Sequence, residues 1–229
     1  MKSLIKTLQQ MKLSPKELLE PDPTIEFRQD LHRYFDLQQQ HWVGSSVSDI
    51  CKDNSFFTQV LLRDDQDEKK KQILESINRG VTVHSAIEHW FKTGGEVLDA
   101  GDYRAWVHQF ISSPNIKGWS CLASEYKMID RRYDIAGTLD LLLEKDDRIV
   151  IADLKTKNVK FSKNHLAVKT QLGGYISLLY HVLPSIDIAA ARVYWITPEE
   201  CSSDEYDTQT CLELYERARS LYRQQKTTF

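Results

Sequence analysis

The residues from Glu125 to Tyr175 read EYKMIDRRYDIAGTLDLLLEKDDRIVIADLKTKNVKFSKNHLAVKTQLGGY, and they decide the fold. Three apolar segments, at about residues 122–129, 133–144 and 148–154, are separated by short polar turns, a pattern typical of consecutive β-strands. The segment from about residue 165 to 183 is apolar on almost all sides, which predicts a helix buried against the sheet. A helix within residues 96–112 is expected before these strands, and a further strand at 189–197 and a helix at 208–225 complete the expected order.

Two carboxylates and an amine lie where the predicted strands end. Asp140 ends one apolar run, and Asp153 and Lys155 end the next. Because side chains alternate along a strand, Asp153 and Lys155 should share one face while Leu154 points into the core. Paired carboxylates bind hard divalent cations, and an ammonium can orient or deprotonate an attacking water. The pattern suits metal-dependent phosphodiester hydrolysis; the alternative is a hairpin whose ends carry solvated charges.

Four pieces of sequence in a fixed order strengthen the first interpretation. They are Arg79-Gly80-x-x-Val83-His84-x-x-Ile87-Glu88, then Glu125, then Ala136-Gly137-Thr138-x-Asp140, then Asp153-Leu154-Lys155-Thr156 with Gln171-x-x-x-Tyr175. In this order they resemble the PD-(D/E)XK nucleases of the RecB exonuclease type, in particular the branch of the mitochondrial genome maintenance exonuclease and its phage relatives. The resemblance covers roughly residues 73–197.

The resemblance implies an α/β fold with a restriction-endonuclease-like αβββαβ core, in which helices flank a central mixed sheet. A length of 229 residues suits one such domain. We expect a single nuclease domain over residues 1–229, with accessory helices in 1–70, the core in 71–200 and a C-terminal helix in 201–229. Residues 26–41 follow a helical period through Phe27, Leu31, Tyr34 and Gln38, and residues 1–16 favour a surface helix.

The resemblance also implies the roles of the site residues. Asp140 and Asp153 would be the central metal ligands, joined by the Leu154 carbonyl and His84, and Lys155 would position or activate the water. Glu125 would bind a second metal or a water of the first metal's shell, and Gln171 and Tyr175 would support the lysine and the phosphate. Oxygen ligands imply Mg²⁺ or Mn²⁺, and a histidine ligand favours tolerance of Mn²⁺.

His84 has two interpretations. A long helical pattern over about residues 67–92 places it on an apolar stripe, where a core histidine is the simpler expectation. Against the family pattern it becomes a metal ligand. The residues of the stripe are Ile73, Ile77, Val81, His84, Ile87 and Phe91. Gly80 should allow another element to approach this helix closely, and Glu88 should either hold the second imidazole nitrogen or face solvent.

Charge is unevenly distributed along a chain of formal net charge -3. Residues 154–186 contain no Asp or Glu, whereas residues 193–216 contain no Lys or Arg. An acidic protein can therefore present a local groove that attracts phosphate, although the alternative is a solvated lysine loop. The candidate DNA-binding residues are Arg79, Ser46, Thr156, Lys157, Lys160, Lys163 and Lys169. For Ser46 the simpler expectation is that it, or Ser48, caps a short helix ending at Cys51.

Several classes of protein are not expected. The four cysteines lack the late cluster that some RecB-type nucleases use for an iron–sulfur centre, and there is no Walker phosphate loop for ATP. The sequence shows neither a membrane-spanning run nor a secretory signal. We expect a cytoplasmic protein in a bacterial or phage-infected cell, with mitochondrial targeting left open.

The resulting hypothesis is a deoxyribonuclease, an exonuclease on single-stranded DNA, in DNA replication, recombination or repair. Its partners would be single-stranded DNA and replication or recombination proteins. N-terminal helices would arch over the lysine loop, where Tyr34, Phe35, Trp42, Phe56 and Phe57 either stack on bases or belong to the core. The alternatives are a structure-specific endonuclease or resolvase of the same fold, and a catalytically inactive DNA-binding subunit.

Overall fold

A mixed sheet forms the centre of the protein. The computed structural model describes residues 19–29, 31–51, 67–158 and 163–227. β5 pairs with β6 and β6 with β7 as antiparallel neighbours, β7 pairs with β8 in parallel, and β9 closes the edge as an antiparallel strand. The strands are β4 (Ser45–Ser46), β5 (Ser120–Asp130), β6 (Ile135–Lys145), β7 (Arg148–Thr156), β8 (Ile188–Ile196) and β9 (Cys201–Tyr206). The α/β core of the restriction-endonuclease type is confirmed.

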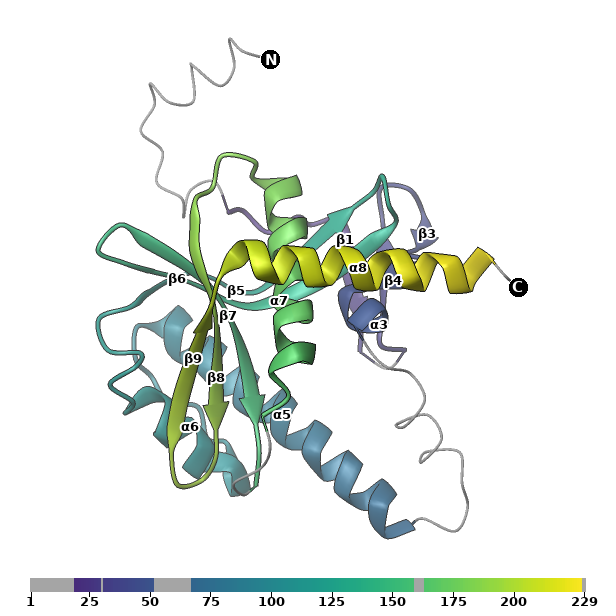
Figure 1. The fold of residues 1–229 in the computed structure, drawn as a ribbon. Coiled ribbons are helices and arrows are strands. Elements are labelled where there is room, and N and C mark those ends of the chain that lie inside the picture. Colours follow the sequence, from purple (N-terminus) through teal and green to yellow (C-terminus); the bar gives the residue numbers. More distant parts are fainter. Residues whose placement is uncertain (1–18, 30, 52–66, 159–162, 228–229) are drawn as a thin grey trace.

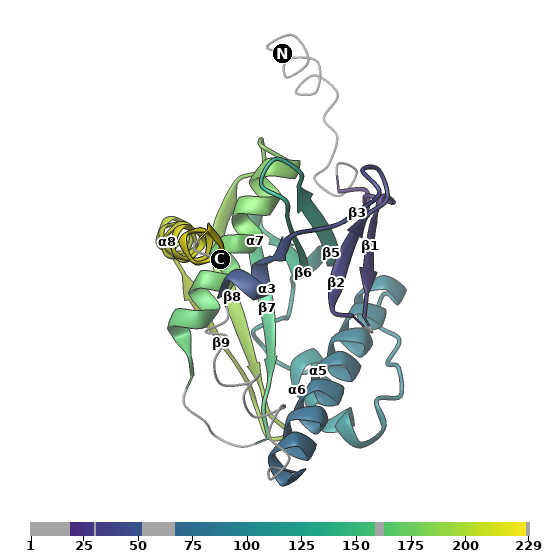
Figure 2. The same cartoon turned by 90° about the vertical axis from the view of Figure 1, so that its right-hand side faces the viewer.

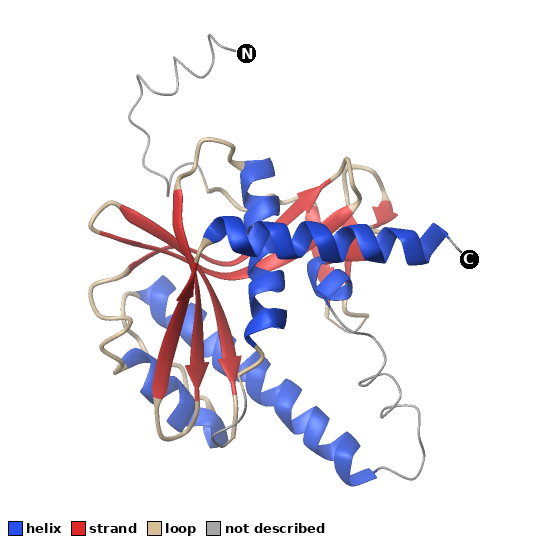
Figure 3. Ribbon diagram, in the orientation of Figure 1, coloured by secondary structure: helices blue, strands red, loops and turns tan. Residues whose placement is uncertain are grey.

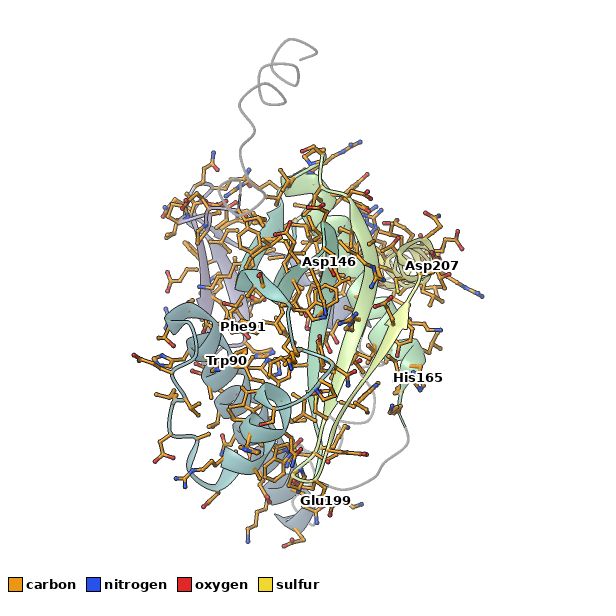
Figure 4. The ribbon with its side chains drawn as sticks, turned by 90° about the vertical axis from the view of Figure 1, so that its left-hand side faces the viewer. Trp90, Phe91, Asp146, His165, Glu199 and Asp207 are labelled. Carbon is orange, nitrogen blue, oxygen red and sulfur yellow. The ribbon has the colours of Figure 1, made fainter. Side chains whose placement is uncertain are left out.

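Tight turns set the register of the central strands. Lys145 pairs with Arg148 across a two-residue turn, and Asp146 and Asp147 both adopt positive φ, at 51° and 60°. Such a turn matches the twist of the flanking strands, and aspartate tolerates this conformation. Asp146 in the β6–β7 turn and Glu199 in the β8–β9 turn lie at opposite ends of the sheet (Figure 4).

Helices cover both faces of the sheet (Figures 2 and 3). One layer contains α5 (Asp67–Thr93), a 3₁₀ turn (Gly101–Tyr103) and α6 (Arg104–Ile111). The other contains α3 (Val47–Cys51), α7 (His165–Val182) and α8 (Thr208–Thr227). Side chains of β7 alternate between the two cores, since Val150, Ala152 and Leu154 pack toward α5 while Ile149 and Ile151 pack toward α7.

β6 and β7 separate partway along the sheet. Their last paired residues are Leu141 and Ala152, after which β7 continues beside β8 as far as Thr156. The N-terminal end of β6 pairs with β4 instead. Figure 1 shows β7, β8 and β9 descending together away from the β5–β6 pair. We call this opening the fork; the first residue beyond the pairing is Asp140 on one side and Asp153 on the other.

The helix α7 lies where it is predicted, and its glycines explain how α8 crosses it. A Cβ atom on Gly173 would lie 2.0 Å from the carbonyl oxygen of Cys211, and one on Gly174 would lie 2.5 Å from Val47 Cγ1. Both distances are far inside van der Waals contact. The backbones of α7 and α8 therefore meet directly, as the two adjacent glycines indicate.

The prediction of a helix over residues 26–41 is wrong. This segment forms a small antiparallel sheet of β1 (Ile25–Arg28), β2 (Arg33–Asp36) and β3 (His41–Trp42). Ile25 and Tyr34 are buried while their neighbours Glu26 and Arg33 are exposed, so the burial alternates with period two. Leu31, which the helical stripe requires to be buried, is 50% exposed in the connecting turn. The predicted helix over residues 1–16 lies outside the described residues.

Arg131 attaches this small sheet to the β5–β6 turn. Its guanidinium donates to Asp36 Oδ2 at 2.7 Å and to Thr24 Oγ1 at 2.7 Å, and it reaches Asp22 Oδ2 at 3.4 Å. Asp36 is fully buried. The bidentate contact between Arg131 and Asp36 fixes the orientation of the sheet as well as its position.

Three further expectations need correction. The helix expected within residues 96–112 begins only at Arg104, and β9 was not expected at all. Ile77 and Val81 of the α5 stripe are 52% and 47% exposed, although Arg79 and Val83 are buried, because Ile77 and Val81 line an open groove instead of packing on the sheet. A Cβ on Gly80 would meet only Thr156 Oγ1, at 4.0 Å, so no element packs closely there. No described helix combines the length and the apolar character that spanning a bilayer requires.

Candidate active site

The predicted carboxylates face each other across the fork. Asp140 Oδ2 accepts a hydrogen bond from the backbone amide of Leu154 at 2.7 Å, so β6 and β7 are bridged just where their regular pairing ends. Asp140 and Asp153 are 8% and 1% exposed. The two residues lie in the interior of the sheet at the fork, rather than at the strand ends that the sequence suggests.

Lys155 lies on the α7 side of the fork, on the same face of β7 as Asp153. Its Nζ contacts Asp153 Oδ2 at 2.9 Å and donates to Gln171 Oε1 at 2.9 Å. Gln171 in turn donates from Nε2 to the Tyr175 hydroxyl at 2.7 Å. The structure therefore brings together Lys155, Gln171 and Tyr175, and one turn of α7 fixes the position of the amine.

His84 enters the fork from α5. Its Nε2 donates to the Leu154 carbonyl at 3.1 Å, and its Nδ1 lies 3.4 Å from Glu125 Oε1 and 3.6 Å from Asp140 Oδ1. These contacts favour the interpretation of His84 as a site residue over that of a core histidine. Glu88 contacts Lys92 instead and takes no part in the cluster.

Glu125 reaches the cluster from the middle of β5 through an unusual backbone conformation. Its φ is 46°, in the left-handed region that residues with a Cβ rarely adopt. Both neighbours pair regularly with β6, Ser124 with Leu141 and Tyr126 with Leu139. Strained conformations of this kind persist where the surroundings enforce them, and they concentrate at functional sites.

Burial and charge together shift the pKa values in the cluster. Burial raises the pKa of Asp153 to about 6, although Lys155 opposes the shift, and Asp140 adds to it. Burial also raises the pKa of Asp140; the charge of His84 opposes this rise, and the charge of Glu125 adds to it. For His84, burial alone would lower the pKa, but the carboxylates of Asp140 and Glu125 outweigh it and raise the pKa to about 9. The carboxylates thus favour additional positive charge at this position.

The donor atoms fit a hard divalent cation. One ligand atom from each of His84, Glu125 and Asp140 can be chosen so that all lie within 4.8 Å of one another. Asp153 Oδ2 is buried and accepts no hydrogen bond within the described part of the chain, although Lys155 lies beside it. Carboxylate oxygens are the ligands that hard divalent cations prefer. The Leu154 carbonyl, also predicted as a ligand, faces the same cluster through its contact with His84.

Arg79 supports the segment that follows β7. It is 3% exposed and donates to Asn158 Oδ1 at 2.7 Å, while its guanidinium lies over Trp106. Trp106 donates to the Lys157 carbonyl at 2.8 Å, a contact that the sequence did not suggest. Burial lowers the pKa of Lys157, and the charges of Lys155 and Arg79 lower it further. Thr156 ends β7 next to these residues.

The other candidate DNA-binding residues lie elsewhere. Ser46 caps α3: its Oγ accepts from the Asp49 amide at 3.0 Å, and Asp49 Oδ2 accepts from the Ser46 amide at 2.9 Å. Lys163 pairs with Asp204 at 3.0 Å and Lys169 lies over Tyr206, so both belong to the β9 edge of the sheet. Lys160 lies outside the described residues.

A groove of about 1190 Å³ opens beside the cluster, between α5, β1 and β5. His84 and Glu125 belong to its wall as well as to the cluster. The apolar part of its wall includes Phe27, Ile77 and Val81. The groove could not be predicted from the sequence, because β1 forms part of its wall and residues 26–41 were expected to form a helix. Of the aromatic residues suggested for base stacking, Tyr34 is buried, and Phe56 and Phe57 lie outside the described residues.

Comparison with known proteins identifies a family for this chain. No curated protein matches the sequence. The fold is similar to the solved structure of SSO0001, at 16% identity over 77% of this chain and 76% of that chain with a TM-score of 0.39. It is also similar to the alkaline exonuclease LHK-Exo from Laribacter hongkongensis, at 10% identity over 82% and 96% with a TM-score of 0.34. The family model of the PD-(D/E)XK nuclease superfamily matches residues 105–227, which is more than half of the 229 residues. This chain belongs to the PD-(D/E)XK nuclease superfamily.

Proposed function

We propose that the protein is a divalent-metal-dependent deoxyribonuclease that degrades single-stranded DNA from an end, in replication, recombination or repair. The observation that supports it most is the convergence at the fork of three carboxylates, His84 and Lys155 from four separate elements. A catalytically inactive DNA-binding subunit has no need for the buried carboxylates of Asp140 and Asp153 beside that of Glu125, since burying charged groups costs stability.

The residues of the fork have distinct roles in this proposal. His84, Glu125, Asp140, Asp153 and the Leu154 carbonyl would hold the cation. When bound, a divalent cation supplies an activated water and offsets negative charge on the phosphate. Lys155, held by Asp153 and Gln171, orients the attacking water or donates to a phosphate oxygen. Tyr175 fixes Gln171, so that the lysine retains its position when the substrate binds.

The groove beside the cluster supports a single-stranded substrate. The side chains of Ile77 and Val81 are about half exposed on α5 and line the groove. Apolar walls suit unpaired bases, whose flat faces are accessible, whereas duplex presents mainly its phosphates to a protein. Lys157 follows β7 directly beyond the fork, where it would attract a phosphate, and the buried Arg79 supports this segment through Asn158.

A comparison of circular and linear single-stranded DNA tests the proposal. With Mg²⁺ or Mn²⁺, the linear strand should be digested while the circle of the same sequence persists, and EDTA should stop the digestion. Asp153→Asn is the matched inactive control. Blunt duplex should be cut slowly, because paired bases cannot lie against the apolar wall of the groove.

The other outcomes identify the alternatives. Equal loss of circle and linear strand would indicate an endonuclease of the same fold. Binding of the strand without any cleavage at saturating metal would indicate a DNA-binding subunit. Digestion that continues in EDTA would refute the role of a cation.

A further inference from the structure

Three guanidinium groups surround one tyrosine ring on the α8 side of the molecule. Arg219 and Arg223 lie one turn apart on α8, and their Cζ atoms are 4.5 Å and 4.6 Å from the centroid of the Tyr133 ring. Arg132, next to Tyr133 in the β5–β6 turn, lies at 5.2 Å. We call these four residues the Tyr133 cluster. It lies on the opposite side of the sheet from α5 and its groove (Figure 2).

Attraction to the ring and repulsion between the cations are of similar size in this cluster. A cation–π contact at an exposed site contributes about 0.5–1 kcal/mol. The distances of 4.5 Å and 4.6 Å to one centroid allow the Arg219 and Arg223 charges to be at most ~9 Å apart, and at that separation two unit charges repel by ~0.5 kcal/mol in water and by ~2 kcal/mol at an effective dielectric constant of 20. Gathering the guanidinium groups around one ring therefore stabilises the fold little by itself, whereas a bound anion would relieve the repulsion.

Of the acidic side chains near the cluster, Glu216 already offsets the charge of Arg219, whereas Asp130 is bound by backbone amides. Glu216 pairs with Arg219, and the Asp130 carboxylate accepts the backbone amides of Arg132 and Tyr133. Lys226, one turn beyond Arg223, donates to the Gly44 carbonyl at 2.9 Å and to Ser45 Oγ at 3.0 Å. Positive charge therefore continues from the cluster to the start of α3.

The strand β6 joins this surface to the fork. Tyr133 lies in the turn before β6, Ile135 and Ala136 pair with Ser45 and Ser46, and Asp140 follows at the fork. Seven residues of extended strand span roughly 23 Å. A DNA strand that leaves the fork in this direction would therefore pass Lys226, which contacts Ser45, and then the Tyr133 cluster.

We propose that the Tyr133 cluster is a second binding site, for the phosphate backbone of the single strand whose end occupies the fork. Guanidinium groups match phosphate oxygens in geometry as well as in charge. The inference rests on the proposed function for the identity of the strand. It adds a site seven residues along β6 from the catalytic residue Asp140, roughly 23 Å away, and this site holds the strand without taking part in cleavage.

The test measures binding without cleavage. Affinity for a fluorescein-labelled thirty-residue oligothymidylate is determined by anisotropy in EDTA, over a range of salt concentrations. For Arg132→Gln/Arg223→Gln, the loss of two phosphate contacts should reduce the slope of log K against log salt by ~1.4 and weaken binding ~10- to 30-fold near 0.1 M salt. Arg132→Lys/Arg223→Lys keeps both charges and should retain most of the slope. Arg104→Gln/Lys145→Gln removes the same charge elsewhere and should leave it unchanged.

A single variant covers the case in which the double variant does not fold. If the double glutamine variant unfolds, Arg132→Gln alone decides, because Arg132 lies outside α8; its slope should fall by ~0.7. An unchanged slope in a folded variant would overturn the proposal and leave the cluster as a contact that docks α8 onto the turn. An equal loss in the Arg104→Gln/Lys145→Gln control would overturn it as well. Because no cleavage is measured, failure of the nuclease proposal would appear separately, as intact DNA in the presence of metal.

Discussion

Replacing Gly173 with alanine tests whether direct backbone contact holds α7 against α8. Taken as a helix residue alone, this change should stabilise the protein by about 1 kcal/mol. The structure predicts the opposite sign, because the new Cβ would lie 2.0 Å from the Cys211 carbonyl oxygen and 3.0 Å from Tyr215 Cβ. Relief requires α8 to move by more than 1 Å, roughly the difference from an ordinary contact of 3.5 Å. Overpacking commonly costs 1–3 kcal/mol, and backbone cannot turn aside as a side chain can. We expect a net loss of about 2 kcal/mol or more.

Gly80→Ala is the matched control for this prediction. Gly80 also lies within a helix, but its added Cβ would meet only Thr156 Oγ1, at 4.0 Å. This variant should therefore show the gain of about 1 kcal/mol that helix propensity predicts. Urea denaturation followed by tryptophan fluorescence and circular dichroism should move the two midpoints in opposite directions. A stabilised Gly173→Ala protein would refute the close approach of α7 and α8.

The remaining predictions concern the fork and the small sheet. His84→Ala should raise the Mn²⁺ concentration for half-maximal cleavage ~10-fold or more with little change in melting temperature, whereas Val83→Ala should lower the melting temperature and leave the metal titration unchanged. Lys155→Ala should reduce cleavage at saturating metal by at least ~100-fold while the circular dichroism spectrum stays the same; near-normal turnover would exclude its role. Burial raises the pKa of Asp36, but hydrogen bonds from Arg131 and from two backbone amides outweigh burial and lower the pKa below its usual value. Since the folded pKa is the lower one, this carboxylate stabilises the fold above pH ~4 and loses that contribution as the pH falls through the folded pKa. Unfolding of Asp36→Asn in urea should accordingly depend less on pH between ~4 and ~2 than that of the parent, and an identical pH dependence would contradict the assignment.

The elements of the core could be predicted because each depends on local sequence. β5, β6 and β7 have turn residues at both ends, and the segment of α7 is too uniformly apolar to be anything but buried. The structure of residues 26–41 could not be predicted in this way, because their apolar residues fit both the period of a helix and the period of a strand. Phe27 and Tyr34 fit a helical stripe and also fit alternating strands, and the choice depends on contacts far away in the sequence. Tyr34 reaches Thr138 at 2.8 Å, and Asp36 reaches Arg131.

For the candidate site, the types of the residues could be predicted from the sequence, but their positions in space could not. Asp140, Asp153, Lys155 and His84 could be recognised from their types and order, since the chemistry limits which side chains can serve. Their convergence depends on the point where β7 leaves β6, and that point is set by the long parallel pairing of β7 with β8. No local pattern encodes this pairing, which joins residues about forty positions apart.

The backbone conformation of Glu125 could not be predicted from the sequence. A regular strand would alternate its side chains through this position, but the φ of 46° alters the direction of the Cα–Cβ bond at one residue while Ser124 and Tyr126 keep their pairing. The carboxylate thereby lies beside His84. Glycine would adopt this backbone conformation without strain but carries no carboxylate. If the Glu125 carboxylate binds the cation as we propose, that binding explains why a strained glutamate occupies this position. The explanation requires the backbone angle, which cannot be predicted from the sequence of β5.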